Sequence, residues 1–145
     1  MARSNNSELF KSFPRLRNSR FHVCSPETPE YNCIAWAIGR SDLLMWPNKQ
    51  SSWPPLCPYE ETIEAFRTAF RTLGYEPCDD EQYEQGFEKI ALYAKEGKPK
   101  HAARQLANGQ WTSKLGQNVD IEHNLSDIEG PKYGQVVMFF RRPTQ

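Results

Sequence analysis

The sequence lacks several features that would place it in a functional class at once. It has no run of the roughly 18 apolar residues that a transmembrane helix needs, so we expect no membrane contact. The first thirty residues contain no apolar stretch of the signal-peptide type, which predicts a cytoplasmic protein. The formal net charge is zero, from 18 Lys+Arg and 18 Asp+Glu. This balance argues against nucleic-acid binding through bulk positive charge.

Cysteine and histidine are too sparse and too scattered to indicate a cross-linked or metal-bound domain. The four cysteines, at positions 24, 33, 57 and 78, form no Cys-x-x-Cys pair, and only three histidines are present. This spacing fits neither a disulfide framework nor a structural zinc site. We therefore expect no metal and no cofactor. The one metal alternative would combine His22 and Cys24 with a distant third ligand.

The chain has the length and aromatic content of a single folded domain. Its 145 residues match one domain, and 12% aromatic residues are enough to build a core. Residues 1–20 are polar and basic, which predicts a flexible N-terminal arm. Residues 21–145 then form the domain.

Helix signals come first along the chain and strand signals follow. Asn32 can cap a helix that starts at Cys33 and ends near Gly39. Apolar residues at helical spacing predict a second helix over residues 59–73. Strands are expected at 87–94, 100–106, 110–115 and 135–142. This order predicts an α+β domain, with N-terminal helices packed on an antiparallel sheet of about five strands.

Three residues in this arrangement could perform nucleophilic chemistry. A thiol in the first turn of a helix lies beside free backbone N–H groups and the positive end of the helix dipole, so Cys33 is the candidate nucleophile. His101 begins a strand and is the candidate base. Across the hairpin at Asn108-Gly109, Ser113 is expected near the level of His101 and would orient its ring. Thr112 and Lys114 are alternatives if the register differs.

This arrangement resembles the papain-like thiol hydrolases, in particular the small NlpC/P60-type domains. In that group a Cys opens a helix, a His starts a later strand, and a third polar residue follows about a dozen positions on. Cys33, His101 and Ser113 match this order. The resemblance implies a papain-like core and a cysteine peptidase or amidase that acts on a peptide or protein substrate. The chain departs from the group's usual Asp-Cys-Ser-Gly, because it has Asn-Cys-Ile-Ala at 32–35.

The sequence is also similar to a group of uncharacterised bacterial proteins. They share Tyr-Asn-Cys-Ile-Ala-Trp-Ala, His-Ala-Ala-Arg-Gln and Trp-Thr-Ser-Lys-Leu-Gly, which here occupy 31–37, 101–105 and 111–116. Asp-Ile-Glu-His follows at 120–123. That likeness extends along much of the chain and brings no assigned activity.

Further polar and aromatic residues are candidates for supporting roles. We expect Asn32, Trp53 and Lys114 to contribute to substrate binding, Trp53 as the wall of a groove and Lys114 by holding negative charge near a thiolate. His123, with Asp120 three residues earlier, is the alternative base or orienting partner.

Two functions of different classes fit these observations. The first is a cysteine hydrolase or acyl transferase that uses a Cys33–His101 pair on an amide bond. The second is a non-catalytic binding or regulatory module, for example a toxin-neutralising partner, in which the thiol only packs. The reactivity of Cys33 separates them, because a packed thiol ignores alkylating reagents and an activated one does not.

Overall fold

The computed structural model describes residues 6–144, which form three short α-helices, two 3-10 helices and seven strands. In chain order the elements are α1 (Asn6–Ser12), η1 (Pro14–Asn18), β1 (His22–Ser25), α2 (Cys33–Ala37), α3 (Ile63–Thr72), β2 (Glu76–Cys78), β3 (Phe87–Lys95), β4 (Lys98–Gln105), β5 (Trp111–Lys114), β6 (Asp120–His123), η2 (Leu125–Ile128) and β7 (Gln135–Pro143).

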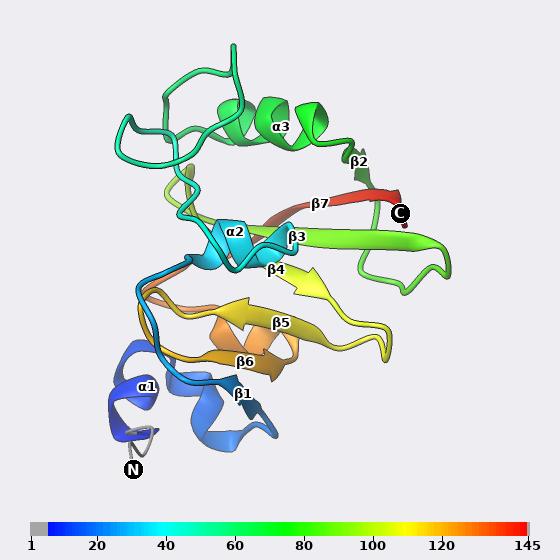
Figure 1. Cartoon of the computed structure of the whole chain (residues 1–145). Helices are drawn as coiled ribbons and strands as arrows, with labels where there is room; N and C mark the ends of the chain where they lie inside the picture. Colours follow the sequence, from blue (N-terminus) through cyan, green and yellow to red (C-terminus); the bar gives the residue numbers. More distant parts are fainter. Residues whose placement is uncertain (1–5, 145) are drawn as a thin grey trace.

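All seven strands belong to one antiparallel sheet (Figure 1). The order across the sheet is β1-β6-β5-β4-β3-β7-β2, so β4 lies at the centre. The four strands expected from the sequence correspond to β3, β4, β5 and β7. The other three strands are only three or four residues long. Such short segments carry too little alternation to be recognised from the sequence.

The expected fold class is therefore wrong. The protein is mostly β, with seven strands and three short helices in the described residues, and it lacks a papain-type α+β core built on about five strands. One physical reason is that α2 is only five residues long. Gly39, two residues after the end of α2, has a φ of +84°. A glycine in this left-handed conformation ends the helix, because other residues rarely adopt it.

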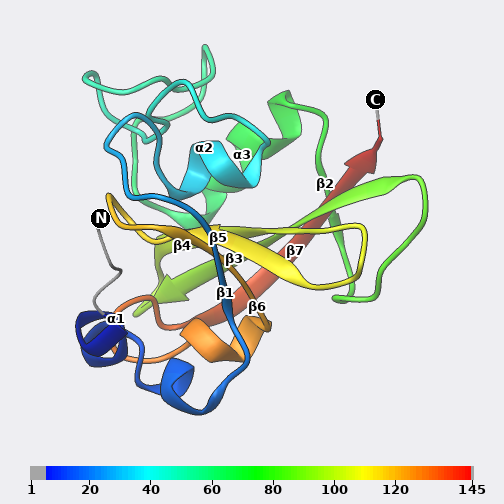
Figure 2. The same ribbon diagram turned by 60° about the horizontal axis from the view of Figure 1, so that its bottom comes forward.

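The sheet separates two hydrophobic cores, because successive side chains of a strand point to opposite faces. Ile90 and Leu92 of β3 pack in the core beneath α2 and α3, which we call the α2–α3 core. Ala91 and Tyr93 pack in the core formed with α1, η1 and η2, which we call the α1 core. Figure 2 shows α2 and α3 on one side of the sheet and α1 on the other.

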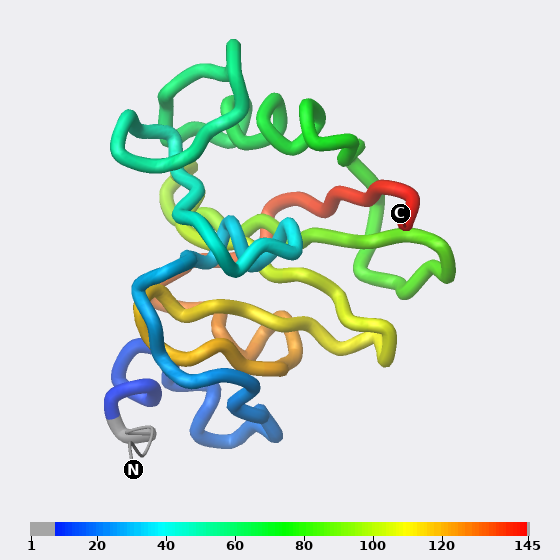
Figure 3. Tube along the Cα trace, viewed as in Figure 1, coloured from blue at the N-terminus to red at the C-terminus, as the bar shows by residue number. Residues whose placement is uncertain are grey.

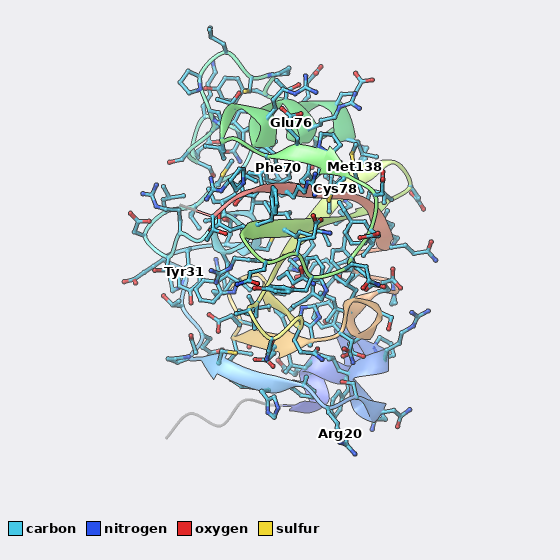
Figure 4. The ribbon with its side chains drawn as sticks, turned by 90° about the vertical axis from the view of Figure 1, so that its right-hand side faces the viewer. Arg20, Tyr31, Phe70, Glu76, Cys78 and Met138 are labelled. Atoms are coloured by element: carbon cyan, nitrogen blue, oxygen red, sulfur yellow. The ribbon has the colours of Figure 1, made fainter. Side chains whose placement is uncertain are left out.

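The helix α3 completes the α2–α3 core. Its side chain Phe70 contacts the ring of Phe140 in β7, at 5.1 Å between ring centroids. Figure 4 shows Phe70 and Met138 between α3 and β7. Thr62 caps the start of α3 by accepting a hydrogen bond from the Ala65 N–H, so the helix begins later than the expected residue 59. Figure 3 shows the long connection from α2 to α3 extending beyond α3.

The N-terminal region is more ordered than expected. Residues 6–18 form α1 and η1, and Leu9, Phe13 and Leu16 are buried in the α1 core. The ring of Phe13 lies 5.0 Å from that of Tyr133, between centroids. Most of the expected flexible arm is thus an amphipathic segment, whose apolar residues are interspersed with Ser, Asn and Arg. The first five residues of the expected arm lie outside the described part. None of the helices within residues 6–144 has the length and apolarity to cross a membrane.

Candidate active site

Cys33 is the first residue of α2, as its sequence context predicts. The side chain of Asn32 caps the helix by accepting a hydrogen bond from the Ala35 N–H at 3.2 Å. The same Oδ1 accepts from the Met45 N–H at 3.0 Å, and Asn32 Nδ2 donates to the Met45 carbonyl at 2.8 Å. Asn32 therefore holds the start of α2 against the segment around Met45 through both its oxygen and its nitrogen.

The Cys33 thiol is buried in a polar backbone environment. Burial is the largest influence and raises its pKa to about 11. Backbone N–H groups of Ala102, Ile34 and Cys33 itself face the sulfur and act in the opposite direction, as does the charge of Lys114. Because desolvation outweighs the helix N-terminus, the resting group is a neutral thiol.

The sulfur lies where two central strands separate. The ladder between β4 and β5 pairs Gln105 with Trp111 and Arg104 with Thr112, and it goes no further. Both strands nevertheless continue past this point, β4 back to Lys98 and β5 on to Lys114. The backbone N–H of Ala102 in this unpaired stretch is one of the groups that face the sulfur. We call the stretch over which β4 and β5 are not paired, residues 98–103 of β4 and 113–114 of β5, the opening between β4 and β5, and it is the candidate site.

His101 is completely buried on the other side of the sheet from Ala102. Its ring stacks on Tyr133, with centroids 4.1 Å apart and planes 9° apart, and meets the ring of Tyr93 edge-on at 5.3 Å. Neither ring nitrogen has a hydrogen-bond partner in the described part of the chain. Burial, and secondarily the charge that His123 would carry, lowers the pKa of His101 well below its ordinary value. The imidazole is therefore neutral and has a free lone pair.

Cys33 and His101 approach this opening from opposite faces. Ala102 and Cys33 belong to the α2–α3 core, whereas His101 contacts two tyrosines of the α1 core. The two side chains form no hydrogen bond, since both nitrogens of His101 are unpartnered. Burial raises the pKa of Tyr133 well above its usual range, and the charge of a Cys33 thiolate adds to this effect. The thiol is thus within electrostatic reach of the Tyr133 ring that stacks on His101.

Ser113 contacts the second buried histidine. Its Oγ lies 2.7 Å from His123 Nε2, and His123 Nδ1 lies 2.7 Å from the Asn124 carbonyl. The Asn124 carbonyl can only accept, so Nδ1 carries the proton and Ser113 donates to Nε2. Burial lowers the pKa of His123 to about 4. Ser113 does not lie opposite His101, because the ladder between β4 and β5 pairs Arg104 with Thr112 and ends there.

Lys114 lies in a separate buried cluster on the α2 side. Its ammonium donates to the carbonyls of Thr28 and Asn118, and it lies 5.2 Å above the Tyr31 ring. Burial lowers the pKa of Lys114, and the nearby Asp120 opposes that shift. Tyr31 donates to Asp120 Oδ2 at 2.6 Å, while Asp120 Oδ1 has no partner among the described residues. Lys114 thus connects the loop that contains Thr28 with the loop that contains Asn118, near the Cys33 thiol.

Trp53 lies away from this opening. Its indole N–H donates to the Pro58 carbonyl at 2.9 Å, and its ring meets Phe66 of α3 at 5.1 Å. It lines an apolar cavity of about 240 Å³ between α3 and the preceding connection, and Cys33 is not among the lining residues.

No group of three or more His, Cys, Asp or Glu side chains within residues 6–144 has the geometry to hold a metal ion. His22 and Cys24 lie on the exposed edge strand β1.

Tyr133 contributes to the site but could not be identified from the sequence. It follows the turn at Gly130-Pro131 and has no motif that marks it. Its role depends on a contact with His101 from a distant part of the chain. A sequence alone gives no signal for such a contact.

Comparison with known proteins assigns the chain to a family without assigning an activity. The profile of a family described as a domain of unknown function (DUF7689) matches residues 22–141. No curated protein and no solved structure matches the chain. The matched region starts at β1, ends within β7 and contains every residue of the opening between β4 and β5. Because it covers most of the sequence, the chain belongs to the DUF7689 family.

Proposed function

We propose that the protein is a cysteine hydrolase or acyl transferase that acts on amide bonds, with Cys33 as nucleophile and His101 as base. The observation that carries this proposal is the fully buried His101 with two unpartnered ring nitrogens. Burying a polar group without a hydrogen bond is costly, and such groups are rare in native proteins. If His101 exchanges a proton with Cys33 during the reaction, its unpaired nitrogens have a function, and this function explains why the energetic cost of burying them is retained.

A concentration of buried polar groups around this opening supports the same proposal. Among the residues that the structure describes, eight polar or charged ones are buried, and six of them lie in three adjacent strands. They are His101, Thr112, Ser113, Lys114, Asp120 and His123. A core selected only for stability would hold apolar side chains of similar size at these positions. Perturbed titratable groups gathered at one place are typical of functional sites.

The shifted pKa values of Cys33 and His101 favour a mechanism in which the thiol proton moves during attack. They argue against a thiolate–imidazolium ion pair that exists before the substrate binds. The thiol is neutral because its pKa is about 11, and the imidazole is neutral because its pKa is lowered. As the Cys33 sulfur bonds to the substrate carbonyl carbon, its proton would have to cross the opening between β4 and β5 to reach His101, because the two side chains lie on opposite faces of the sheet and form no hydrogen bond. The imidazolium then protonates the leaving amine as the carbon–nitrogen bond breaks and a thioester remains. Water or a second amine releases the acyl group.

Backbone donors are available for the oxyanion in this proposal. The N–H groups of Cys33, Ile34 and Ala102 face the sulfur, so a carbonyl oxygen bound beside the sulfur would meet them. Ser113 acts on His123, and the charge that His123 would carry lowers the pKa of His101. Access of substrate requires the surrounding loops to open, because Cys33 is 7% exposed and His101 is 0% exposed.

The proposal is tested with p-nitrophenyl acetate, a small activated ester that acetylates a competent thiol. Intact-mass and peptide analysis would locate the acetyl group. We expect acetylation of Cys33 and none at this position in Cys33→Ala. Cys57→Ala is the matched control, because Cys57 is also a buried free thiol but lies outside the opening. Acetylation confined to Cys24, Cys57 or Cys78 would overturn the assignment.

The role of His101 is tested with His101→Phe, which keeps an aromatic ring against Tyr133 and removes both nitrogens. If His101 is the base, acetylation of Cys33 slows by about 100-fold or more, the usual contribution of general base catalysis. His22→Gln, on the exposed β1, is the control. Unchanged acetylation in a folded His101→Phe variant would exclude His101 as the base.

The raised pKa of Cys33 favours one alternative, a non-catalytic binding module in which the thiol only packs. This alternative predicts no acetylation of Cys33 at any pH below its pKa. The same measurement therefore separates the two functions.

A further inference from the structure

A second concave site lies on the α1 face of the sheet, outside the opening between β4 and β5. It is a cavity of about 600 Å³, bounded by the β2–β3 connection, the β4–β5 hairpin, η2 and β7. Three aromatic side chains line it, namely Tyr83, Trp111 and Phe139. Its size is within the range of pockets that bind small ligands or side chains.

Trp111 forms the floor of this cavity with an unused donor. Its side chain is 3% exposed, and its ring lies 6.1 Å from that of Phe139. The indole N–H makes no hydrogen bond to any described residue, yet it is not among the enclosed unsatisfied atoms. Because Trp111 lines the cavity, this N–H is a donor that a ligand bound there can use.

The charge of the cavity is negative. No lysine or arginine lines it, whereas Glu81 and Glu129 do. Glu129 already pairs with Arg15 at 3.3 Å, so its charge is largely compensated. Glu81 has no ion pair in the described part of the chain. Its backbone is fixed because Gln105 Nε2 donates to the Glu81 carbonyl at 2.8 Å.

We propose that this cavity binds the arginine side chain of a peptide. An arginine guanidinium stacks on aromatic rings and pairs in a bidentate manner with a carboxylate, which matches Tyr83, Trp111 and Glu81. The Trp111 N–H is then available to donate to a peptide carbonyl group. Lysine fits less well, since its ammonium is a point charge that is more strongly hydrated.

The position of the cavity connects it to the proposed active site. Asn124 and Leu125 line the cavity and directly follow His123, whose ring accepts from Ser113. The Leu125 carbonyl accepts from the hydroxyl of Tyr93, the residue in edge contact with His101. A peptide held in the cavity would therefore lie next to the residues that pack around His101 at the opening between β4 and β5. The identification of the arginine site as a substrate site rests on the proposed function, while binding itself does not.

The test measures peptide binding to the full-length Cys33→Ala variant, which removes turnover from the experiment. The probes are acetyl-Gly-Arg-Gly-amide and its citrulline counterpart, which has the same shape without the charge. Binding is followed through the indole N–H resonance of Trp111 in ¹H–¹⁵N spectra. We expect the arginine peptide to shift this resonance and to bind at least about tenfold more tightly than the citrulline peptide, the factor that about 1.4 kcal/mol produces.

Variants of exposed carboxylates identify the charge responsible. Glu81→Gln is expected to weaken the arginine peptide about tenfold, which corresponds to a lost charge-assisted pair. Glu60→Gln, an exposed glutamate outside the cavity, is the matched control and should leave binding unchanged. Equal binding of the two peptides, an unshifted Trp111 resonance, or an unaffected Glu81→Gln variant would each overturn the proposal.

The outcome is independent of the acetylation experiment. Arginine binding without acetylation of Cys33 would support the arginine site and contradict the acyl-transfer proposal. Acetylation without arginine binding would do the reverse.

Discussion

The side chain of Asn32 should contribute more to stability than an ordinary helix cap. It forms three hydrogen bonds, one to the Ala35 N–H within the cap and two to the backbone of Met45. Replacing a cap residue with alanine costs about 1 kcal/mol. Met45 is 3% exposed, so its N–H and carbonyl would lose their partners away from water. Each unsatisfied buried group costs about 1 kcal/mol or more.

Asn32→Ala is therefore expected to destabilise the protein by about 3 kcal/mol, the sum of the cap and the two orphaned groups. Thr62→Ala provides the matched control, because Thr62 caps α3 through one hydrogen bond to the Ala65 N–H. That variant should lose only about 1 kcal/mol. For a chain of this size the two values correspond to decreases of about 10 °C and 3 °C in Tm.

Urea denaturation followed by circular dichroism measures both variants on the same scale. A third variant, Asn32→Ser, keeps an oxygen that can cap the Ala35 N–H and removes both bonds to the backbone of Met45. It should fall between the other two. Equal losses for Asn32→Ala and Thr62→Ala would refute the reasoning, because they would mean that the bonds to Met45 add nothing.

Three further predictions concern backbone packing and pH. Gly134 has φ +74°, and an added Cβ would lie 2.0 Å from the Ala94 carbonyl oxygen, so Gly134→Ala should cost about 3 kcal/mol or more. Gly109→Ala, where φ is +87° and no atom lies within 4 Å, should cost only about 1 kcal/mol in the same urea titration. Burial holds the pKa of His123 at about 4 against an ordinary 6.5, so the unfolded chain takes up more protons as the pH falls between these values. Stability should decrease by about 3 kcal/mol over this range, and a folded His123→Gln variant with the same acid sensitivity would contradict the assignment. Burial raises the pKa of Cys33 from 9.0 to about 11, so the unfolded chain loses its proton first and stability should decrease between these values as the pH rises. The loss is about 2–3 kcal/mol, and comparison with Cys33→Ala isolates it, since that variant should not show it.

Local signals in the sequence predicted the start of α2 and the long strands, because their causes lie within a few residues. Asn32 does cap a helix that begins at Cys33, and the strand expected at 87–94 corresponds to β3. The assembly of the sheet could not be predicted in the same way. The short strands β1, β2 and β6 exist because they pair with partners far along the chain. Tertiary pairing outweighs local pattern in such segments.

The candidate site illustrates the same limit at the level of single residues. The sequence identified Cys33 and His101 as candidates but could not show that they lie on opposite faces of the sheet. Ser113 was expected to orient His101, and its partner is His123. The cause is the hairpin register, which depends on the length of the β4–β5 turn. A change of two residues in that pairing would bring Ser113 opposite His101.

The contact between Phe13 and Tyr133 also constrains when the protein can fold during synthesis. The helix α1 is synthesised before the other elements of the sheet and its cores, but most of the core that buries it is supplied by residues after position 90. Its apolar side chains can therefore be buried only after the residues up to Tyr133 have been synthesised. A nascent chain stopped before β7 would expose Leu9, Phe13 and Leu16, and such partially made chains would be recognised by chaperones that bind apolar helices.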